Sequence, residues 1–141
     1  MKVIACIDDN GGILFNNRRV SRDKLVIENI LDYIKPNILY ITDFSTNLFA
    51  DHMDSNKIKI IEEIDYGSDD YYFIENISLN DYCKYIDEIV IYKWNRVYPS
   101  DFKFNIDLNC YNKIKELEFV GNSHDLITRE IYSKKVDIYE W

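Results

Sequence analysis

Three consecutive segments between residues 71 and 92 constrain the fold of this chain more than any other part of the sequence. Residues 71–74 are aromatic and β-branched, which is typical of a strand, and residues 88–92 have the same character. Between them, residues 78–86 carry apolar side chains at helical spacing and predict a helix that packs on the sheet. A strand, a helix and a strand in this order form a parallel crossover unit. The sequence therefore predicts an α/β protein with a mainly parallel central sheet and flanking helices.

Short apolar runs elsewhere in the chain predict the other strands. Residues 2–7 and 37–41 are continuous apolar runs, as in strands that are covered on both faces, and residues 58–61 predict a further strand. Near the end of the chain, residues 113–120 and 128–139 predict an antiparallel pair. We therefore expect a sheet that is parallel at its centre and closed by a C-terminal antiparallel hairpin.

Two more helices are predicted from caps and apolar spacing. Ser21 is a good N-cap for a helix with one apolar stripe, and Pro36 stops it. A short helix through residues 48–50 is predicted to follow a cap at Asp43 or Ser45. The helix after Ser21 is expected to pack on the sheet, as is the helix that begins at Ser78.

Composition indicates one globular unit with one core. The chain has 141 residues, of which 47% are hydrophobic, with only four glycines and two prolines, so residues 1–141 are predicted to form a single domain. It has neither a long apolar run nor a signal-like segment, and we expect a cytoplasmic protein without a membrane span. Cys6, Cys83 and Cys110 are odd in number and lack CxxC spacing, which predicts reduced core thiols.

The net charge of −8 disfavours nucleic acid as a partner, because an acidic surface repels a phosphate backbone. The only basic stretch is residues 18–22, and direct nucleic-acid binding is not expected. An acidic decoy that binds a nucleic-acid-binding protein remains an alternative.

Candidate metal ligands and nucleophiles lack the spacing that their chemistry needs. No H-x-H, H-E-x-x-H or EF-hand spacing links the acids and histidines, so acids that form turns explain them better and no metal is expected. The candidates are Asp8, Asp9, Asp43, His52, Asp54 and His124. Ser123 beside His124 could form a nucleophile pair, but no G-x-S-x-G motif surrounds it and a hairpin turn is favoured.

Glycine and asparagine mark two early turns. Gly11 and Gly12 follow an Asp-Asn pair, which favours a turn with φ > 0 over a close approach to a ligand. Asn16 and Asn17 give a second turn signal after a short apolar run. Residues 102–106 alternate between apolar and polar, which suits a half-exposed strand.

Laid end to end, this pattern resembles the dihydrofolate reductase family. Residues 8–13, Asp-Asp-Asn-Gly-Gly-Ile, resemble the family's D-x-N-x-G-I-G segment, and the helix after Ser21 resembles its substrate-side helix. Residues 38–49 resemble the segment that holds the adenosine end of the cofactor, and residues 118–132 resemble the terminal hairpin. The resemblance implies a dihydrofolate reductase-like fold over nearly the whole chain.

The resemblance also implies a ligand groove and one catalytic acid. Asp23 matches the helix carboxylate that pairs with a pterin ring, although a first-turn carboxylate favoured by the helix dipole explains it as well. The groove is expected between the 8–13 loop, this helix and the 75–78 junction. Its expected residues are Cys6, Gly11, Gly12, Ile13, Asp43, Glu75 and Asn76.

The sequence departs from the family pattern where the cofactor would bind. Glu75-Asn76 replaces a Gly-Gly pair, and residues 42–45, Thr-Asp-Phe-Ser, replace Gly-Arg-x-Thr, so Asp43 takes the place of an arginine that binds phosphate. Residues 19–20, Arg-Val, replace a proline and a tryptophan. We expect the cofactor half of the groove to repel NADPH, and no cofactor to bind.

These departures predict a non-catalytic binding or interaction protein, a pseudoenzyme on this fold. Its partner is expected to be a protein, because six tyrosines and a tryptophan within residues 71–98 could leave an aromatic patch rimmed by acids. The alternative is an NADPH-dependent reductase of a pterin-like or other heterocyclic substrate. Whether the chain is an enzyme stays open, with the sequence leaning against it.

Overall fold

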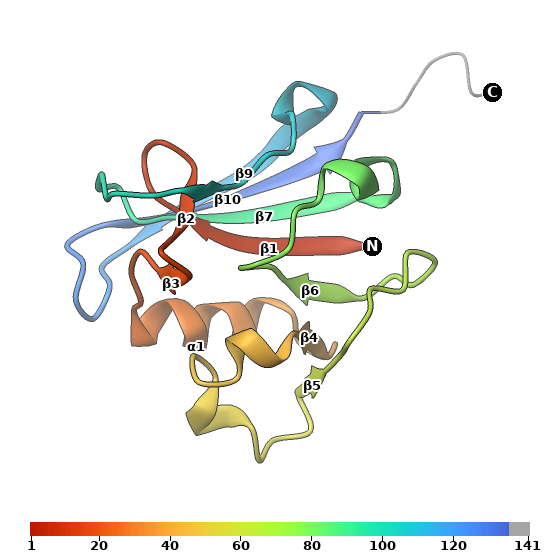
Figure 1. Ribbon diagram of the computed structural model, residues 1–141, viewed down its shortest axis with the longest axis horizontal. Coiled ribbons are helices and arrows are strands. Elements are labelled where there is room, and N and C mark those ends of the chain that lie inside the picture. Colours follow the sequence, from red (N-terminus) through yellow and green to blue (C-terminus); the bar gives the residue numbers. More distant parts are fainter. Residues whose placement is uncertain (136–141) are drawn as a thin grey trace.

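A seven-stranded sheet forms the centre of the molecule in the computed structural model, which describes residues 1–135 except for the side chains of residues 80–82 (Figure 1). Five strands are parallel, β10 pairs antiparallel with β7, and β9 pairs antiparallel with β10. In spatial order the strands are β5 (Ile58–Ile60), β4 (Leu39–Ile41), β6 (Tyr71–Phe73), β1 (Lys2–Ile7), β7 (Glu88–Lys93), β10 (Ile127–Lys134) and β9 (Tyr111–Phe119). The predicted fold class, a mainly parallel sheet with a C-terminal hairpin, is confirmed.

The crossover between β6 and β7 passes over the central strand. Both strands pair in parallel with β1, one on each side of it. The segment that joins them is not the predicted α-helix but a 3-10 helix, η3 (Asn80–Tyr85). A 3-10 helix rises about 2.0 Å per residue against about 1.5 Å in an α-helix, so the same few residues reach further across β1.

Helix α1 (Lys24–Tyr33) begins two residues later than predicted. Its N-cap is Asp23 and not Ser21: Asp23 has extended backbone, and its Oδ1 accepts a hydrogen bond of 2.9 Å from the Leu25 N–H. The predicted short helix at residues 48–50 is replaced by two 3-10 turns, η1 (Asp43–Ser45) and η2 (Ala50–His52). A further 3-10 turn, η4 (Leu108–Cys110), leads into β9.

A small second sheet, which the sequence analysis did not predict as a sheet, lies beside the central one. It consists of β3 (Arg18–Arg19), β2 (Gly12–Phe15) and β8 (Phe102–Lys103). Asn16 and Asn17 join β2 to β3 with φ values of 50° and 60°, the two positive φ values of a type I′ hairpin turn. This turn places Arg19 opposite Leu14.

Both faces of the central sheet are covered. On one face, α1 and the segment around Phe49 bury Ile4, Phe73 and Val90. On the other, residues from β2, Leu79 and Ile86 on either side of η3, and the loop before β9 cover a second cluster that includes Val3 and Ile91. The end of β1 and the segments after β1 and β6 line a cavity beside α1.

The C-terminal hairpin buries one strand and exposes the other. β10 is buried over most of its length, whereas every residue of β9 from Asn112 to Glu118 is exposed. Residues 136–139 of the predicted second strand lie outside the described residues. In the part that the structure describes, no helix has the length and apolar character needed to cross a membrane.

The prediction of core thiols was wrong for two of the three cysteines. Cys83 and Cys110 are exposed, because they lie in 3-10 turns at the rim of the sheet, and Cys6 is half-buried on β1. All three are free thiols.

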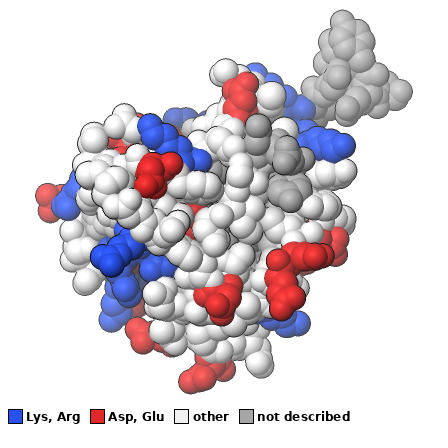
Figure 2. All heavy atoms as spheres, viewed as in Figure 1, with Lys and Arg blue, Asp and Glu red and all other residues white. Residues whose placement is uncertain are grey.

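Charged side chains are spread over the surface. In the face shown in Figure 2, acidic side chains lie at several separate places, and basic side chains gather over β3. Arg19 of this basic stretch is neutralised by an ion pair with Glu75.

Candidate functional site

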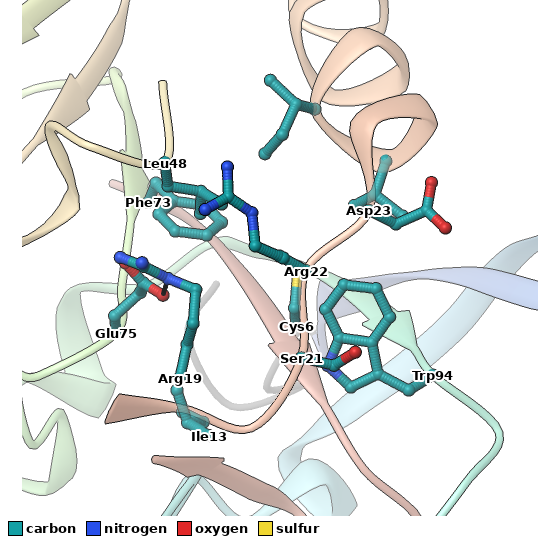
Figure 3. Close-up of a pocket in the computed structure, with 12 residues that line it drawn as sticks. Cys6, Ile13, Arg19, Ser21, Arg22, Asp23, Leu48, Phe73, Glu75 and Trp94 are labelled. Carbon is teal, nitrogen blue, oxygen red and sulfur yellow. Dashed lines mark hydrogen bonds and ion pairs between the residues drawn. The ribbon is translucent and has the colours of Figure 1, made fainter. Parts of the chain in front are cut away.

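The cavity beside α1 is nearly filled by the chain's own side chains. Its lining includes Cys6, Ile13, Asp23, Glu75 and Trp94, which come from β1, β2, the α1 cap and the segments after β6 and β7 (Figure 3). Its volume is about 10 Å³, which is room for about one water molecule. The structure therefore brings four of the predicted site residues together, but around a closed space.

A buried ion pair occupies one side of this cavity. Glu75 is 4% exposed, and its two carboxylate oxygens accept hydrogen bonds from Arg19 Nε (2.8 Å) and Nη2 (2.9 Å). Ser45 Oγ donates a third, of 2.8 Å, to the same carboxylate. The Arg19 guanidinium also lies over the ring of Phe44, 5.6 Å from its centroid. Hydrogen bonding to Glu75 raises the pKa of Arg19, so the guanidinium stays charged.

This pair corrects the expected electrostatics of the groove. From the sequence, Glu75 is expected to repel a cofactor phosphate, but in the structure its charge is compensated by Arg19. What Glu75 does instead is fill space and anchor η1 through Ser45. Arg19 was missed as a site residue, although the Asn16-Asn17 turn was a signal that could have placed it on a hairpin.

Cys6 faces the cavity as a protonated thiol. Burial raises its pKa strongly, the nearby Glu75 carboxylate raises it further, and Arg19 opposes both. A nucleophilic cysteine needs the opposite shift, because the thiolate is the reactive form. Cys6 therefore contributes shape to the site and not reactivity.

The carboxylate of Asp23 points away from the ion pair and toward the β9–β10 hairpin (Figure 3). Besides capping α1 it accepts hydrogen bonds from the N–H groups of Asn122 and Ser123, both at 2.8 Å, and from His124 Nδ1 at 2.8 Å. Burial would raise the pKa of Asp23, but these hydrogen bonds outweigh burial and hold the pKa well below its usual range. The catalytic role expected for Asp23 stays a prediction, and the geometry favours an anchor between α1 and the hairpin.

The hairpin loop is built around this carboxylate. Gly121 N–H donates to the His124 carbonyl at 2.9 Å, which closes the predicted turn. A Cβ on Gly121 would lie 2.5 Å from Asp23 Oδ2, so only glycine fits there. His124 itself is 4% exposed and stacks on Trp94 with ring centroids 4.7 Å apart.

Asp8 and the two glycines form a structured turn at the end of β1. The carboxylate of Asp8 accepts hydrogen bonds from the N–H groups of Asn10 and Gly12 on one oxygen and of Tyr98 on the other. Gly11 has φ of +80°, as the turn prediction requires. A Cβ on Gly12 would lie 2.5 Å from the side chain of Ser100, so its close approach is to the chain itself. Gly11 and Gly12 do not line the cavity.

Asp43 and Asn76 also lie outside the cavity. Both are exposed, and the Thr42 side chain donates a hydrogen bond of 3.3 Å to Asn76 Oδ1. The charge of Asp43 thus faces solvent. No group of three or more potential metal-ligating side chains occurs among the residues that the structure describes.

Two open grooves lie outside the closed cavity. One, of about 510 Å³, runs along the N-terminal half of α1 and shares Arg22, Asp23, Ile27 and Leu48 with the cavity. The other, of about 460 Å³, lies beyond β5 at the opposite side of the sheet and has a floor of three isoleucines. These are Ile61, Ile64 and Ile77.

Comparison with known proteins identifies the fold. No family model and no curated protein matches the sequence. Among solved structures, the chain is similar to the dihydrofolate reductase from Enterococcus faecalis complexed with NADP(H) and RAB-propyl, with a TM-score of 0.67 and 12% identity over 96% of this chain and 97% of that one. The architecture is that of an α/β protein with a parallel sheet closed by an antiparallel hairpin. More specifically, the chain has the dihydrofolate reductase-like fold, as the order of its motifs predicted.

Proposed function

We propose that this chain works by binding, with a protein as its partner, and that it carries out no NADPH-dependent reduction. The supporting observation is the closed cavity beside α1, which has a volume of about 10 Å³ and is occupied by the Arg19–Glu75 pair. A pterin-like ring would need most of a 300–1,000 Å³ pocket of the ordinary ligand-binding kind. The site therefore has no room for substrate without displacing a buried ion pair.

The state of Asp23 supports the same conclusion. Pairing with a ring edge requires a carboxylate with free lone pairs, and this one already accepts hydrogen bonds from five donors of the chain itself. Releasing them would break the hydrogen bonds from Asn122 and Ser123, each worth about 1.5–3 kcal/mol because the acceptor is charged. A heterocycle would thus compete with the anchor that holds α1 to the hairpin.

A protein partner is supported by the groove beyond β5. Its isoleucine floor is flanked by Glu62 and Glu63, and Tyr66 lines it as well. Tyr66 and Tyr85, which are 39% and 41% exposed, stack with ring centroids 5.1 Å apart. An exposed aromatic pair beside an apolar floor with an acidic rim suits a segment that carries Lys or Arg next to apolar side chains.

The test of the proposal is titration with NADPH. If NADPH bound at one site, a concentration of 100 times its Kd would stabilise the fold by about 2.7 kcal/mol and raise the thermal midpoint. Because we propose that NADPH does not bind, we expect no change in the midpoint at millimolar NADPH. The Enterococcus faecalis reductase, whose structure is known with NADP(H), serves as the positive control. Calorimetric binding at micromolar Kd or tighter would overturn the proposal and favour the NADPH-dependent reductase of a heterocyclic substrate.

The protein-binding part has a separate test. A fluorescent peptide of alternating leucine and lysine should bind, and binding should weaken with salt because exposed charges are screened. A double variant, Glu62→Lys and Glu63→Lys, should lose it, while Glu118→Lys, an exposed acid on β9, should not. Equal binding by the two variants would exclude this groove.

A further inference from the structure

Three side chains beside the closed cavity form a line of hydrogen bonds. Ser21 Oγ lies 2.8 Å from His124 Nε2, and His124 Nδ1 lies 2.8 Å from Asp23 Oδ2. A hydroxyl on one ring nitrogen and a carboxylate on the other is the arrangement of a nucleophile, its general base and the group that orients the base. His124 thus contacts Ser21 through Nε2. Ser123, its neighbour in the sequence, contacts Nδ1 instead, at 3.2 Å.

The tautomer of the histidine follows from its surroundings. The carboxylate of Asp23 is ionised, since the hydrogen bonds it accepts lower its pKa, and it can only accept a proton from Nδ1. The neutral ring then carries its hydrogen on Nδ1 and presents the lone pair of Nε2 to Ser21 Oγ. Stacking on Trp94, at an interplanar angle of 26°, fixes the plane of the ring. This is the state in which a histidine can take a proton from serine.

Arg22, the next residue along the chain, supplies a positive charge to the lining of the cavity. It makes no ion pair with any residue that the structure describes. If its guanidinium turned toward Ser21, it would favour an oxyanion formed on an acyl group there.

The cavity next to Ser21 and the open groove along α1 share lining side chains. Arg22 and Leu48 line both the closed cavity and the open groove of about 510 Å³ along α1. Arg22 is exposed, and Figure 3 shows its side chain extending away from Ser21 toward Phe73 and Leu48. Rotation of this side chain into the groove would join the two spaces, which suits a small acyl group.

We propose that Ser21 is a nucleophile that accepts a small acyl group from an activated ester, with His124 as general base and Asp23 as the residue that positions it. Ser21 Oγ attacks the carbonyl carbon while its proton moves to His124 Nε2. The C–O bond to the leaving group then breaks, and the leaving alcohol takes that proton. Water, activated by the same histidine, hydrolyses the acyl-serine to the free acid. This inference goes beyond the proposed binding function, because it concerns acyl transfer and not hydride transfer.

The test uses p-nitrophenyl acetate on the full chain. We expect an acetyl group on Ser21 by peptide mapping, and release of p-nitrophenolate that falls about 100-fold in Ser21→Ala and in His124→Gln. Ser55→Ala is the matched control. Ser55 donates a hydrogen bond to the carbonyl of His52, the other histidine of the chain, and it does not line the cavity. It should react like the unmodified chain.

Two outcomes would overturn the proposal. One is acetylation on lysine or tyrosine with Ser21 unmodified. The other is a release rate in Ser21→Ala equal to that of the unmodified chain, measured after circular dichroism shows both to be folded. Because Ser21→Ala removes one oxygen at a half-buried position, it decides the question even if His124→Gln does not fold.

Discussion

Replacing Arg19 by methionine tests whether the ion pair with Glu75 holds the cavity together. Methionine keeps much of the apolar length of arginine but leaves Glu75, which is 4% exposed, with Ser45 as its remaining donor. Breaking a buried pair from one side costs about 3–5 kcal/mol, because the other charge stays buried without its partner. The Arg19 side chain is 15% exposed, so some water reaches the pair and we expect a loss near the lower end, about 3 kcal/mol.

The assay is urea unfolding at pH 7. With an m value of about 2 kcal/mol per molar, a loss of about 3 kcal/mol lowers the urea midpoint by about 1.5 M. The double variant Arg19→Met with Glu75→Leu removes both charges and should recover most of the loss, since an apolar pair of similar volume is often as stable as a buried ion pair. Arg18→Met, at the exposed neighbour on the same strand, should change stability by less than about 0.5 kcal/mol.

If Arg19→Met is no less stable than Arg18→Met, the ion pair with Glu75 does not stabilise the fold. If Arg19→Met with Glu75→Leu is no more stable than Arg19→Met alone, the unpaired charge is not the cause of the lost stability. The loss would then come from the packing of Arg19 on Phe44.

The shifted pKa values of Cys6 and Asp23 lead to two further predictions. In the folded chain a thiol reagent at pH 8 should modify the exposed Cys83 and Cys110 within minutes and Cys6 only after unfolding, because burial raises the pKa of Cys6; rapid modification of all three thiols by mass spectrometry would contradict this. The pKa of Asp23 is lowered by folding, so its contribution is complete above its unfolded pKa of about 3.9 and is lost as pH falls through the lower folded value. Asp23→Asn should therefore be less stable than the unmodified chain by about 2 kcal/mol at pH 7, with a gap that narrows below about pH 4 in urea unfolding; a gap independent of pH would show that charge on Asp23 contributes nothing.

Element order was predictable because it depends on local periodicity. The strands at Lys2–Ile7 and Glu88–Lys93 are short apolar runs, which is typical of strands that are covered on both faces. Their observed bounds agree with the predicted bounds to within one residue. The helix type at Asn80–Tyr85 was not predictable in the same way. Its apolar spacing suits an α-helix, whereas the structure has the more extended 3-10 form there.

The candidate site was predictable only in part, because its contacts join segments far apart in the sequence. Cys6, Ile13, Asp23 and Glu75 were named from the family pattern, and the structure does bring them to one cavity. What the pattern could not supply was the state of their charges. Arg19 reaches Glu75 across 56 residues, and His124 reaches Asp23 across 101.

Three departures from the dihydrofolate reductase pattern turn out to be in contact. Arg19 stands where the pattern has a proline or tryptophan, Glu75 where it has glycine, and Ser45 in the segment that replaces Gly-Arg-x-Thr; in the structure the carboxylate of Glu75 binds both of the others. A glutamate could not be buried at this position alone, since an unpaired charge there would cost several kcal/mol. The three substitutions therefore act as one unit.

The contacts of Glu75 with Arg19 and Ser45 determine which substitutions could enlarge the cavity. Glu75→Gly alone would leave the Arg19 guanidinium half-buried without its carboxylate, and the fold would lose stability without gaining a cofactor site. Removing both charges, with Glu75→Gly and Arg19→Pro, clears the space at the end of β6 and leaves no buried charge unpaired. NADPH binding would still lack its phosphate contact, because the exposed Asp43 has the wrong sign for it. Under the proposed function, we therefore expect NADPH affinity to need changes on β3, after β6 and in η1 together, and we expect each of these changes made alone to leave binding undetectable by calorimetry.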